Sequence, residues 1–269
     1  MLRLLLLLAA ASALCAPAAA QQNAAAEPVA QSDAAPALLV YSKTTGWRHD
    51  SIDEAWAALA GIASERGWTV VFTEDPAWFE AERLAEFEAV VWALPTGDTL
   101  SDLQKASFRT FVEGGGGFVG LHSAGDSSHT WDWYRENLIG AGYRGHPGDP
   151  NVRDGTLHVE DTDHVATLGL PAEWNAADEW YSFADSAHGA FHVLATIDET
   201  TYLDQANEED RALAMGSDHP MVWVRCVGEG RSFYSALGHT AESYSDPAMR
   251  ALIAGGISWS LGEGNCPAR

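Results

Sequence analysis

The stretch Gly114-Gly-Gly-Gly-Phe-Val-Gly-Leu-His-Ser-Ala-Gly-Asp126 reads as a turn, a short buried strand and a sharp exit that carries polar side chains. Its four consecutive glycines permit backbone angles that other residues resist. The apolar run 118–121 is of the kind that a central parallel strand needs. Ligands of open α/β sheets bind outside the carboxyl ends of the strands. The polar residues after the run therefore form a candidate site: His122, Ser123 and Asp126. In the alternative interpretation, His122 only caps the strand and Gly125 only makes the turn.

The first half of the chain alternates between strand and helix. Short apolar runs predict strands over 37–41, 68–72 and 89–94. Apolar residues at helical spacing predict a helix from Ile52 that Gly67 stops, a short helix over 81–87, and a helix capped by Ser101. This rhythm indicates right-handed βαβ units, and therefore an α/β fold with a parallel sheet.

The regular alternation of strand and helix ends at about residue 130. A helix is expected over 131–138, a long Gly/Pro-rich loop over 140–155 and a closing helix over 248–261. Further strands are expected over 156–160, 191–197, 221–227 and 232–237. We expect several of them to be antiparallel additions to the sheet.

The N-terminus predicts export. Residues 1–20 combine Arg3, a short leucine-rich core and small residues, which is typical of a secretory signal peptide cleaved after Ala20. A lipoprotein anchored at Cys15 is the alternative, disfavoured because Leu14 stands where a small residue is expected. Residues 21–36 have the composition of a disordered linker. The folded domain is then expected over 37–263, in the periplasm or outside the cell.

The net charge limits the classes of ligand that the protein can bind, and the cysteines bear on the compartment in which it folds. The net charge of −23 disfavours nucleic acid and anionic lipid, and favours a neutral or cationic ligand. It also fits a merely acidic exported protein. No later segment of the sequence is apolar for long enough to cross a bilayer. Cys226 and Cys266 predict one disulfide in an oxidising compartment, with two free thiols as the alternative.

Further polar clusters fall at predicted strand ends or in loops. They lie around His49, His146, Glu179, Trp223 and His239. Three or four histidines with a carboxylate suit a zinc site with an open position, or general acid–base chemistry. No pair shows a diagnostic spacing such as His-x-x-x-His, so a structural role stays open for each histidine. That role is favoured most for His129, His158, His188 and His192.

Two further patterns bear on function. Ser123, Glu179 and His239 follow the chain order of a hydrolase triad, although Leu121 replaces the first glycine of the nucleophile elbow. Tryptophans stand beside the polar clusters, where aromatic faces suit a sugar ring. These are Trp47, Trp131, Trp180 and Trp223. Core packing is the alternative role for each of them.

Six motifs together resemble the ThuA-like (trehalose-utilisation) family over about 37–261. They are Gly46-Trp-Arg-His-Asp50, Gly117-Phe-Val-Gly-Leu-His-Ser-Ala-Gly-Asp126, Gly145-His-Pro147, Asp178-Glu-Trp-Tyr181, Pro220-Met-Val-Trp223 and Gly230-Arg-Ser-Phe-Tyr-Ser-Ala-Leu-Gly-His-Thr240. The resemblance implies a flavodoxin-like, class I glutamine amidotransferase-like three-layer sandwich. It also implies a role in sugar metabolism, with keto-glycosides as expected substrates. His122 stands where the amidotransferases place a nucleophilic cysteine, which excludes a thiol-dependent glutaminase.

The leading hypothesis is an exported enzyme that hydrolyses, eliminates or isomerises a sugar or keto-glycoside. The expected catalytic residues are His122, Glu179, His239, His49 and Asp126. The expected substrate-binding residues are Trp47, Arg48, Ser123, Tyr181 and Trp223. A divalent ion such as zinc would be held by His122, His146 and His239. The alternatives are a non-catalytic carbohydrate-binding module and a serine hydrolase that uses Ser123, and the oligomeric state is left open.

Overall fold

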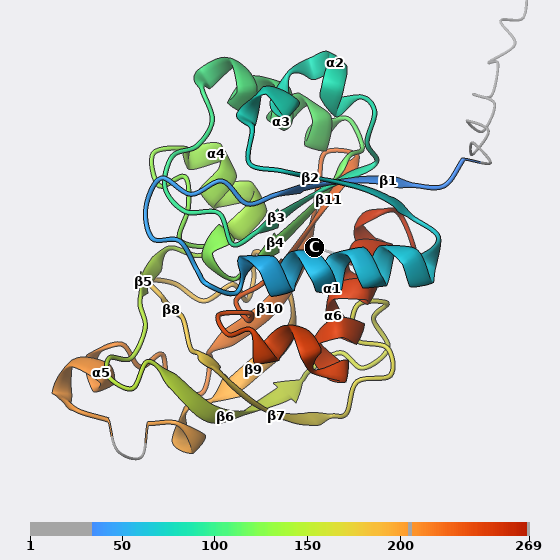
Figure 1. Cartoon of the computed structure of the whole chain (residues 1–269). Helices are drawn as coiled ribbons and strands as arrows, with labels where there is room; N and C mark the ends of the chain where they lie inside the picture. Colours follow the sequence, from blue (N-terminus) through green and yellow to red (C-terminus); the bar gives the residue numbers. More distant parts are fainter. Residues whose placement is uncertain (1–33, 204–205, 268–269) are drawn as a thin grey trace, which may run out of the picture. The chain divides into compact units, whose positions relative to one another are not determined.

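The computed structural model describes residues 34–203 and 206–267. The predicted signal peptide, Cys15 and most of the predicted linker lie outside the described residues. Within them, nine strands form one sheet in the order β2-β1-β3-β4-β11-β10-β9-β6-β7 (Figure 1). The parallel part consists of β1 (Ala37–Tyr41), β2 (Thr69–Thr73), β3 (Ala89–Ala93), β4 (Gly117–Leu121) and β11 (Gly230–Ser235). The antiparallel part adds β10 (Pro220–Val227), β9 (His192–Asp198), β6 (Val152–Val159) and β7 (Glu173–Glu179).

Helices cover both faces of the parallel part, as a three-layer sandwich requires (Figure 1). One face carries α1 (Ile52–Arg66) and α6 (Pro247–Ser260). The other carries α2 (Ala81–Leu84), α3 (Asp102–Glu113), α4 (Asp132–Tyr134) and the π-helix η3 (Arg135–Ile139). Short elements complete the description: η1 (Pro76–Phe79), η2 (His122–Ala124), η4 (Glu199–Thr201), η5 (Glu242–Ser245), α5 (Glu208–Ala212) and the pair β5 (Tyr143–Gly145) and β8 (Ser182–Phe183). The predicted α/β fold with antiparallel additions in the second half is confirmed.

Aromatic rings fill the space between the sheet and the α3–α4 side. The Trp92 ring of β3 stacks on Phe108 of α3 at 5.7 Å and on Tyr134 of α4 at 4.8 Å, measured between ring centroids. Phe118 of β4 meets Trp92 edge-on at 6.0 Å. All four side chains are fully buried. Because stacked and edge-on rings add to the burial of apolar area, this cluster anchors the helices to the central strands.

The glycine run before β4 serves close packing more than backbone freedom. Only Gly115 of the four has a positive φ, of 118°. A Cβ on Gly116 would overlap the Phe111 ring, and one on Gly117 would lie 2.6 Å from the Ser260 carbonyl oxygen. The missing side chains therefore let β4 enter the sheet directly against α3 and the end of α6.

The second half departs from the sequence prediction at β7 and α4, among other places. β7 was not expected, because its sequence Glu-Trp-Asn-Ala-Ala-Asp-Glu is rich in residues with low strand propensity. It forms because it pairs with β6 along its whole length, from Val152 opposite Glu179 to His158 opposite Glu173. The expected helix over 131–138 is instead the short α4 followed by the π-helix η3.

Cys226 of β10 and Cys266 form a disulfide, which ties the segment after α6 to the antiparallel part of the sheet. The β10 strand is thus covalently linked to a segment forty residues later in the chain.

Among the described residues, no helix combines the length and the apolar character that a membrane span needs.

Gly117→Ala tests the close approach of β4 to α6. We expect a loss of about 1–3 kcal/mol in the free energy of unfolding, because the new methyl group would overlap the Ser260 carbonyl and Ala89. Urea-induced unfolding of the variant and the parent measures this difference in the free energy of unfolding. Gly61→Ala is the control, since this helical position of α1 meets only the flexible tip of Arg250. Equal stability of the two variants would contradict the packing argument.

Candidate functional site

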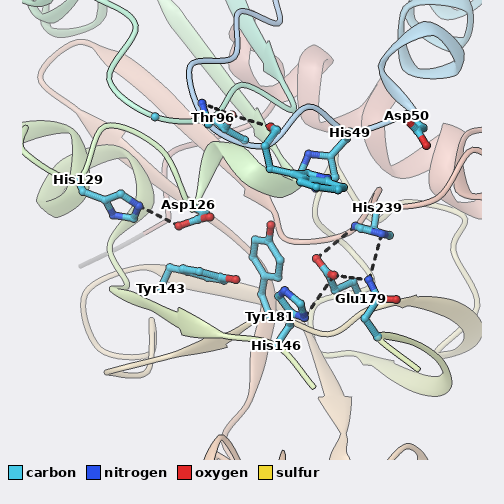
Figure 2. Close-up of a pocket in the computed structure, with 14 residues that line it drawn as sticks. His49, Asp50, Thr96, Asp126, His129, Tyr143, His146, Glu179, Tyr181 and His239 are labelled. Carbon is cyan, nitrogen blue, oxygen red and sulfur yellow. Dashed lines mark hydrogen bonds and ion pairs between the residues drawn. The ribbon is translucent and has the colours of Figure 1, made fainter. Parts of the chain in front are cut away.

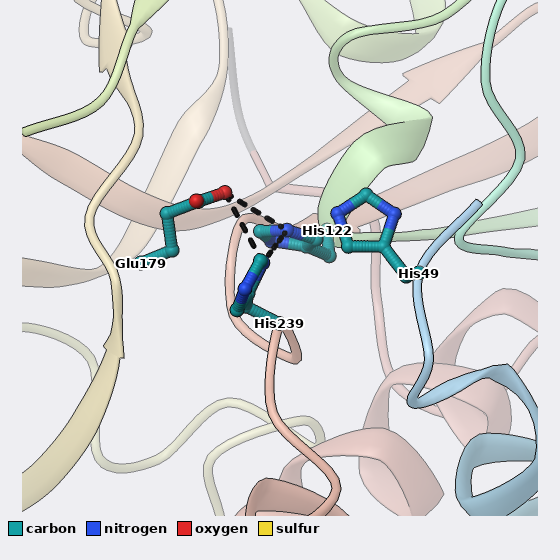
Figure 3. Close-up of side chains that lie close together, drawn as sticks. All are labelled: His49, His122, Glu179 and His239. Carbon is teal, nitrogen blue, oxygen red and sulfur yellow. Dashed lines mark hydrogen bonds and ion pairs between the residues drawn. The ribbon is translucent and has the colours of Figure 1, made fainter. Parts of the chain in front are cut away.

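Four side chains converge at the ends of the strands. His49 follows β1, His122 follows β4, Glu179 is the last residue of β7, and His239 follows β11. Each offers one ligand atom, and these atoms all lie within 4.8 Å of one another. Figure 3 shows the Glu179 carboxylate directed at His122 and His239, with the His49 ring beside them. The parallel strands and β7 therefore deliver one polar cluster, which we call the His/Glu cluster.

Three of the ligand atoms form a nearly regular triangle. His122 Nε2 lies 3.3 Å from His239 Nδ1 and 3.5 Å from Glu179 Oε2. His239 Nδ1 lies 3.2 Å from the same Glu179 oxygen. The residues of the His/Glu cluster are buried, apart from the partly buried His239. Such proximity of imidazoles and a carboxylate requires either shared protons or a shared cation.

The backbone and one hydrogen bond orient His122. Its φ of 49° is in the left-handed region, which is uncommon for a residue other than glycine and marks the sharp turn after β4. Its Nδ1 lies 2.9 Å from the Ala236 carbonyl oxygen, which can only accept a hydrogen bond. Nδ1 is therefore assigned as the protonated nitrogen. In the neutral ring this leaves the lone pair of Nε2 directed at the cluster.

Glu179 carries the negative charge of the cluster. Burial alone would raise its pKa, but hydrogen bonds with His122 and His239 outweigh burial and hold the pKa well below its usual value. Its second oxygen accepts from Asn151 Nδ2 at 2.7 Å and lies 3.3 Å from His146 Nδ1. The carboxylate is thus ionised at neutral pH.

The histidines differ in their readiness to take a proton. Burial lowers the pKa of His49 to about 3, and His122 and His239 act in the same direction. His49 Nδ1 is buried without a hydrogen-bond partner in the described part of the chain. Burial also lowers the pKa of His239, but the hydrogen bond from His239 to Glu179 and the nearby carboxylates together have the larger opposite effect, so the pKa of His239 is raised. His49 is therefore neutral, as a metal ligand must be.

A pocket of about 540 Å³ opens beside the cluster. Its wall includes the His/Glu cluster members His49, Glu179 and His239, but the fully buried His122 lies behind it. Figure 2 shows the Tyr181 hydroxyl pointing into this pocket, with Tyr143 and Asp126 nearby. Asp126 pairs with His129 Nε2 at 2.8 Å. Burial raises the pKa of the Asp126 carboxyl, and the contact with His129 only partly offsets this.

The structure brings most of the predicted site residues together. Besides the His/Glu cluster, the pocket wall includes Trp47, Asp126, His146 and Tyr181. His146 is not one of the four residues that could share a metal ion; His49 and Glu179 are, although the predicted ligand set omitted both. His146 instead contacts the outer oxygen of Glu179 and the Pro147 carbonyl. Of the predicted ligands His122, His146 and His239, the group that could share an ion therefore includes His122 and His239.

Three predicted substrate-binding residues do not face the pocket. The Arg48 guanidinium turns to Glu74 at 2.8 Å, and Arg48 is not among the described residues that line the pocket. Ser123 is fully buried, and its Oγ has no hydrogen-bond partner in the described residues. Trp223 is also fully buried, and its Nε1 donates to the Ile139 carbonyl at 2.7 Å. Trp180 is a core residue as well, because it is fully buried. Its Nε1 donates to the Arg153 carbonyl oxygen.

Sequence reasoning missed Tyr143 and Asn151 of the pocket wall. Both fall in the stretch 140–155, which was expected to be an irregular loop. Its Gly/Pro content concealed β5 and the start of β6. The only available signal was the length of that stretch, since long loops are often functional.

The fold and the site define an α/β protein with a mostly parallel central sheet, in which a buried histidine, His122, follows the strand β4. The family model described as ThuA, trehalose utilisation, matches residues 37–260. The chain belongs to the ThuA family, which gives it a carbohydrate-related role.

Solved structures agree on the fold. A ThuA-like protein of Bacteroides uniformis superposes with a TM-score of 0.71 at 21% identity, covering 88% of this chain and 96% of its own. A ThuA-like protein of Parabacteroides merdae gives 0.63 at 20% identity, with 87% and 93% covered. A cytoplasmic protein of Salmonella typhimurium gives 0.53 at 12% identity, with 83% and 99% covered. A search of curated proteins found no match.

A fluorophosphonate probe tests the serine-hydrolase alternative. We expect no labelling of Ser123, because its buried Oγ contacts neither a histidine nor the pocket. Mass spectrometry of the treated protein measures it, with a known serine hydrolase as the positive control. Labelling that Ser123→Ala removes would restore the triad hypothesis.

Proposed function

We propose that this chain is an exported enzyme that acts on a sugar or keto-glycoside at the His/Glu cluster, with a bound divalent ion such as zinc. The observation that carries the proposal is the convergence of three imidazoles and one carboxylate on one point beside a pocket. His122, His239 and Glu179 would hold the ion, with His49 as the fourth candidate. The family's link to trehalose utilisation supports a sugar as the substrate.

The spacing of the ligand atoms fits a tetrahedral ion. Zinc–ligand distances of about 2.0–2.2 Å place neighbouring ligand atoms of a tetrahedron about 3.3–3.6 Å apart. The three distances between His122, His239 and Glu179 are 3.2, 3.3 and 3.5 Å. The hydrogen bond from His122 Nδ1 to a main-chain carbonyl is also the outer contact that metal-bound histidines make. The unpartnered Nδ1 of His49 is one more buried nitrogen that a ligand or proton would satisfy.

Other residues of the pocket lining supply acid–base groups. When bound, the ion polarises a carbonyl of the substrate as a Lewis acid. Asp126, whose pKa is raised by burial, is then suited to remove a proton from the carbon next to that carbonyl. His129 holds one Asp126 oxygen and leaves the other for the substrate. The Tyr181 hydroxyl, whose pKa burial raises well above its usual value, stays protonated and donates a hydrogen bond.

The lining of the pocket favours an uncharged sugar. It contains three carboxylates, and no lysine or arginine is among its described residues. A sugar phosphate would lack the bidentate partner that arginine offers to a phosphate group. Trp47 is 74% exposed at the pocket wall and provides an aromatic face for a sugar ring.

Export is proposed on two observations. The first twenty residues have the pattern of a signal peptide. The disulfide between Cys226 and Cys266 is of a kind that persists in oxidising compartments such as the periplasm. N-terminal sequencing of the native protein would locate the cleavage site.

Metal content tests the cluster directly. We expect about one equivalent of zinc or another divalent ion in the purified domain, and little in His122→Asn. Asparagine tolerates the left-handed backbone and can donate to Ala236, but it lacks the nitrogen that faces the cluster. Elemental analysis measures the metal, and His158→Asn at a half-exposed position is the control. No metal in the parent after refolding with zinc would remove the metal from the proposal.

Turnover of a 3-keto-disaccharide tests the chemistry. Asp126→Asn should lower kcat by about 10²–10⁴, because it removes the acid–base group and leaves the His/Glu cluster intact. Product analysis measures turnover, and metal content serves as the control for an intact site. Binding of the sugar by the parent without any turnover would favour the carbohydrate-binding module instead.

A further inference from the structure

Asp178 stands behind the His/Glu cluster and not in it. It precedes Glu179 at the end of β7, and consecutive strand residues point to opposite faces. Glu179 therefore faces His122 and His239, while the Asp178 carboxylate turns back toward the segment after β11. Asp178 is only 2% exposed, and it is not among the described residues that line the main pocket. A substrate in that pocket would therefore meet Glu179 and His239 and not the Asp178 side chain.

One oxygen of Asp178 joins two of the cluster residues through their main chains. Its Oδ1 accepts from the main-chain N–H of Glu179 at 2.8 Å and from that of His239 at 3.0 Å. Glu179 ends β7 and His239 follows β11, and these strands are not neighbours in the sheet. The two residues reach the cluster next to each other only if their backbones are held together. A single buried acceptor does this for both.

The second oxygen of Asp178 fixes the turn that carries His239. Its Oδ2 accepts from the Gly238 N–H at 2.8 Å and from Ser243 Oγ at 3.3 Å. Gly238 has a φ of 119°, and a Cβ there would lie 2.5 Å from the Tyr244 hydroxyl. The turn thus has a glycine-dependent shape, and the carboxylate accepts from both of its consecutive N–H groups.

We propose that Asp178 is the positioning residue of the His/Glu cluster: its carboxylate sets the distance between His239 Nδ1 and Glu179 Oε2, and thereby the affinity for a divalent ion. The effect on the affinity for a divalent ion rests on the proposed function. The positioning of His239 and Glu179 by Asp178 does not depend on an ion. A carboxylate is required because every one of its four partners donates. An amide in its place would point its NH₂ group at a main-chain N–H.

Asp178→Asn tests the proposal, with Zn²⁺ as the probe and a chromophoric chelator as the competitor. We expect the affinity for Zn²⁺ to fall about 10- to 100-fold, as it does when outer contacts of metal ligands are removed. Asp246→Asn is the matched control. Asp246 caps α6 by accepting from Ala248 at 2.8 Å and also accepts from Trp174 Nε1 at 3.0 Å, but it contacts no cluster residue. Parent affinity in Asp178→Asn would overturn the proposal.

A second measurement separates this inference from the metal hypothesis. In the metal-free protein, ¹⁵N-detected spectra of the imidazole rings report the contact between His239 Nδ1 and Glu179. We expect the His239 signals to move toward those of a solvent-exposed histidine in Asp178→Asn, and to stay unchanged in Asp246→Asn. If the parent binds no Zn²⁺, the metal hypothesis fails, and these spectra alone decide the role of Asp178. Unchanged His239 signals in Asp178→Asn would overturn it.

A milder variant covers the case in which Asp178→Asn does not fold. Ser243→Ala removes one donor to Oδ2 and leaves the three main-chain hydrogen bonds in place. We expect a smaller loss of Zn²⁺ affinity and a smaller shift of the His239 signals, in the same direction. No change in either measurement would count against the proposal.

Discussion

The hydrogen bond between His122 Nδ1 and the Ala236 carbonyl is the contact on which the site depends. It exists because β4 and β11 are parallel neighbours, with Leu121 opposite Ser235, so that the residues after both strands meet. It selects the nitrogen of His122 that faces the cluster. If β11 were elsewhere in the sheet, the same histidine at the same sharp turn would have no fixed orientation.

The electrostatics of the cluster follow from one carboxylate among imidazoles. Glu179 keeps its charge in spite of burial because His122 and His239 contact one of its oxygens. The same contact stabilises the charged form of His239, whereas His49 gains no such partner and stays neutral. The arrangement combines a fixed negative charge, a proton carrier and a neutral base within a few ångströms. That is the donor set of a cation site and also that of a proton-transfer site.

Much of this could be predicted from residues at strand ends. The apolar runs of β1, β3 and β4 located the parallel sheet, and the position of His122 after β4 located the site. The sequence does not reveal the direction in which each of these side chains points. Trp223 lies within β10 and packs inward, and Arg48 reaches a neighbouring glutamate instead of the pocket. Composition does not reveal which side of a strand or loop is covered, and β7 was hidden because its polar sequence becomes a strand only through pairing with β6.

The wide separation of the cluster residues along the chain has a consequence for folding. His49 lies after the first strand and His239 after the last, so the ligand set is complete only when the whole sheet has formed. Contacts between distant segments close late, because loop-closure entropy must be overcome first. An ion that binds this set therefore cannot template early steps of folding. To the extent that it prefers the complete set, such an ion would by mass action stabilise the finished sheet as one cooperative unit.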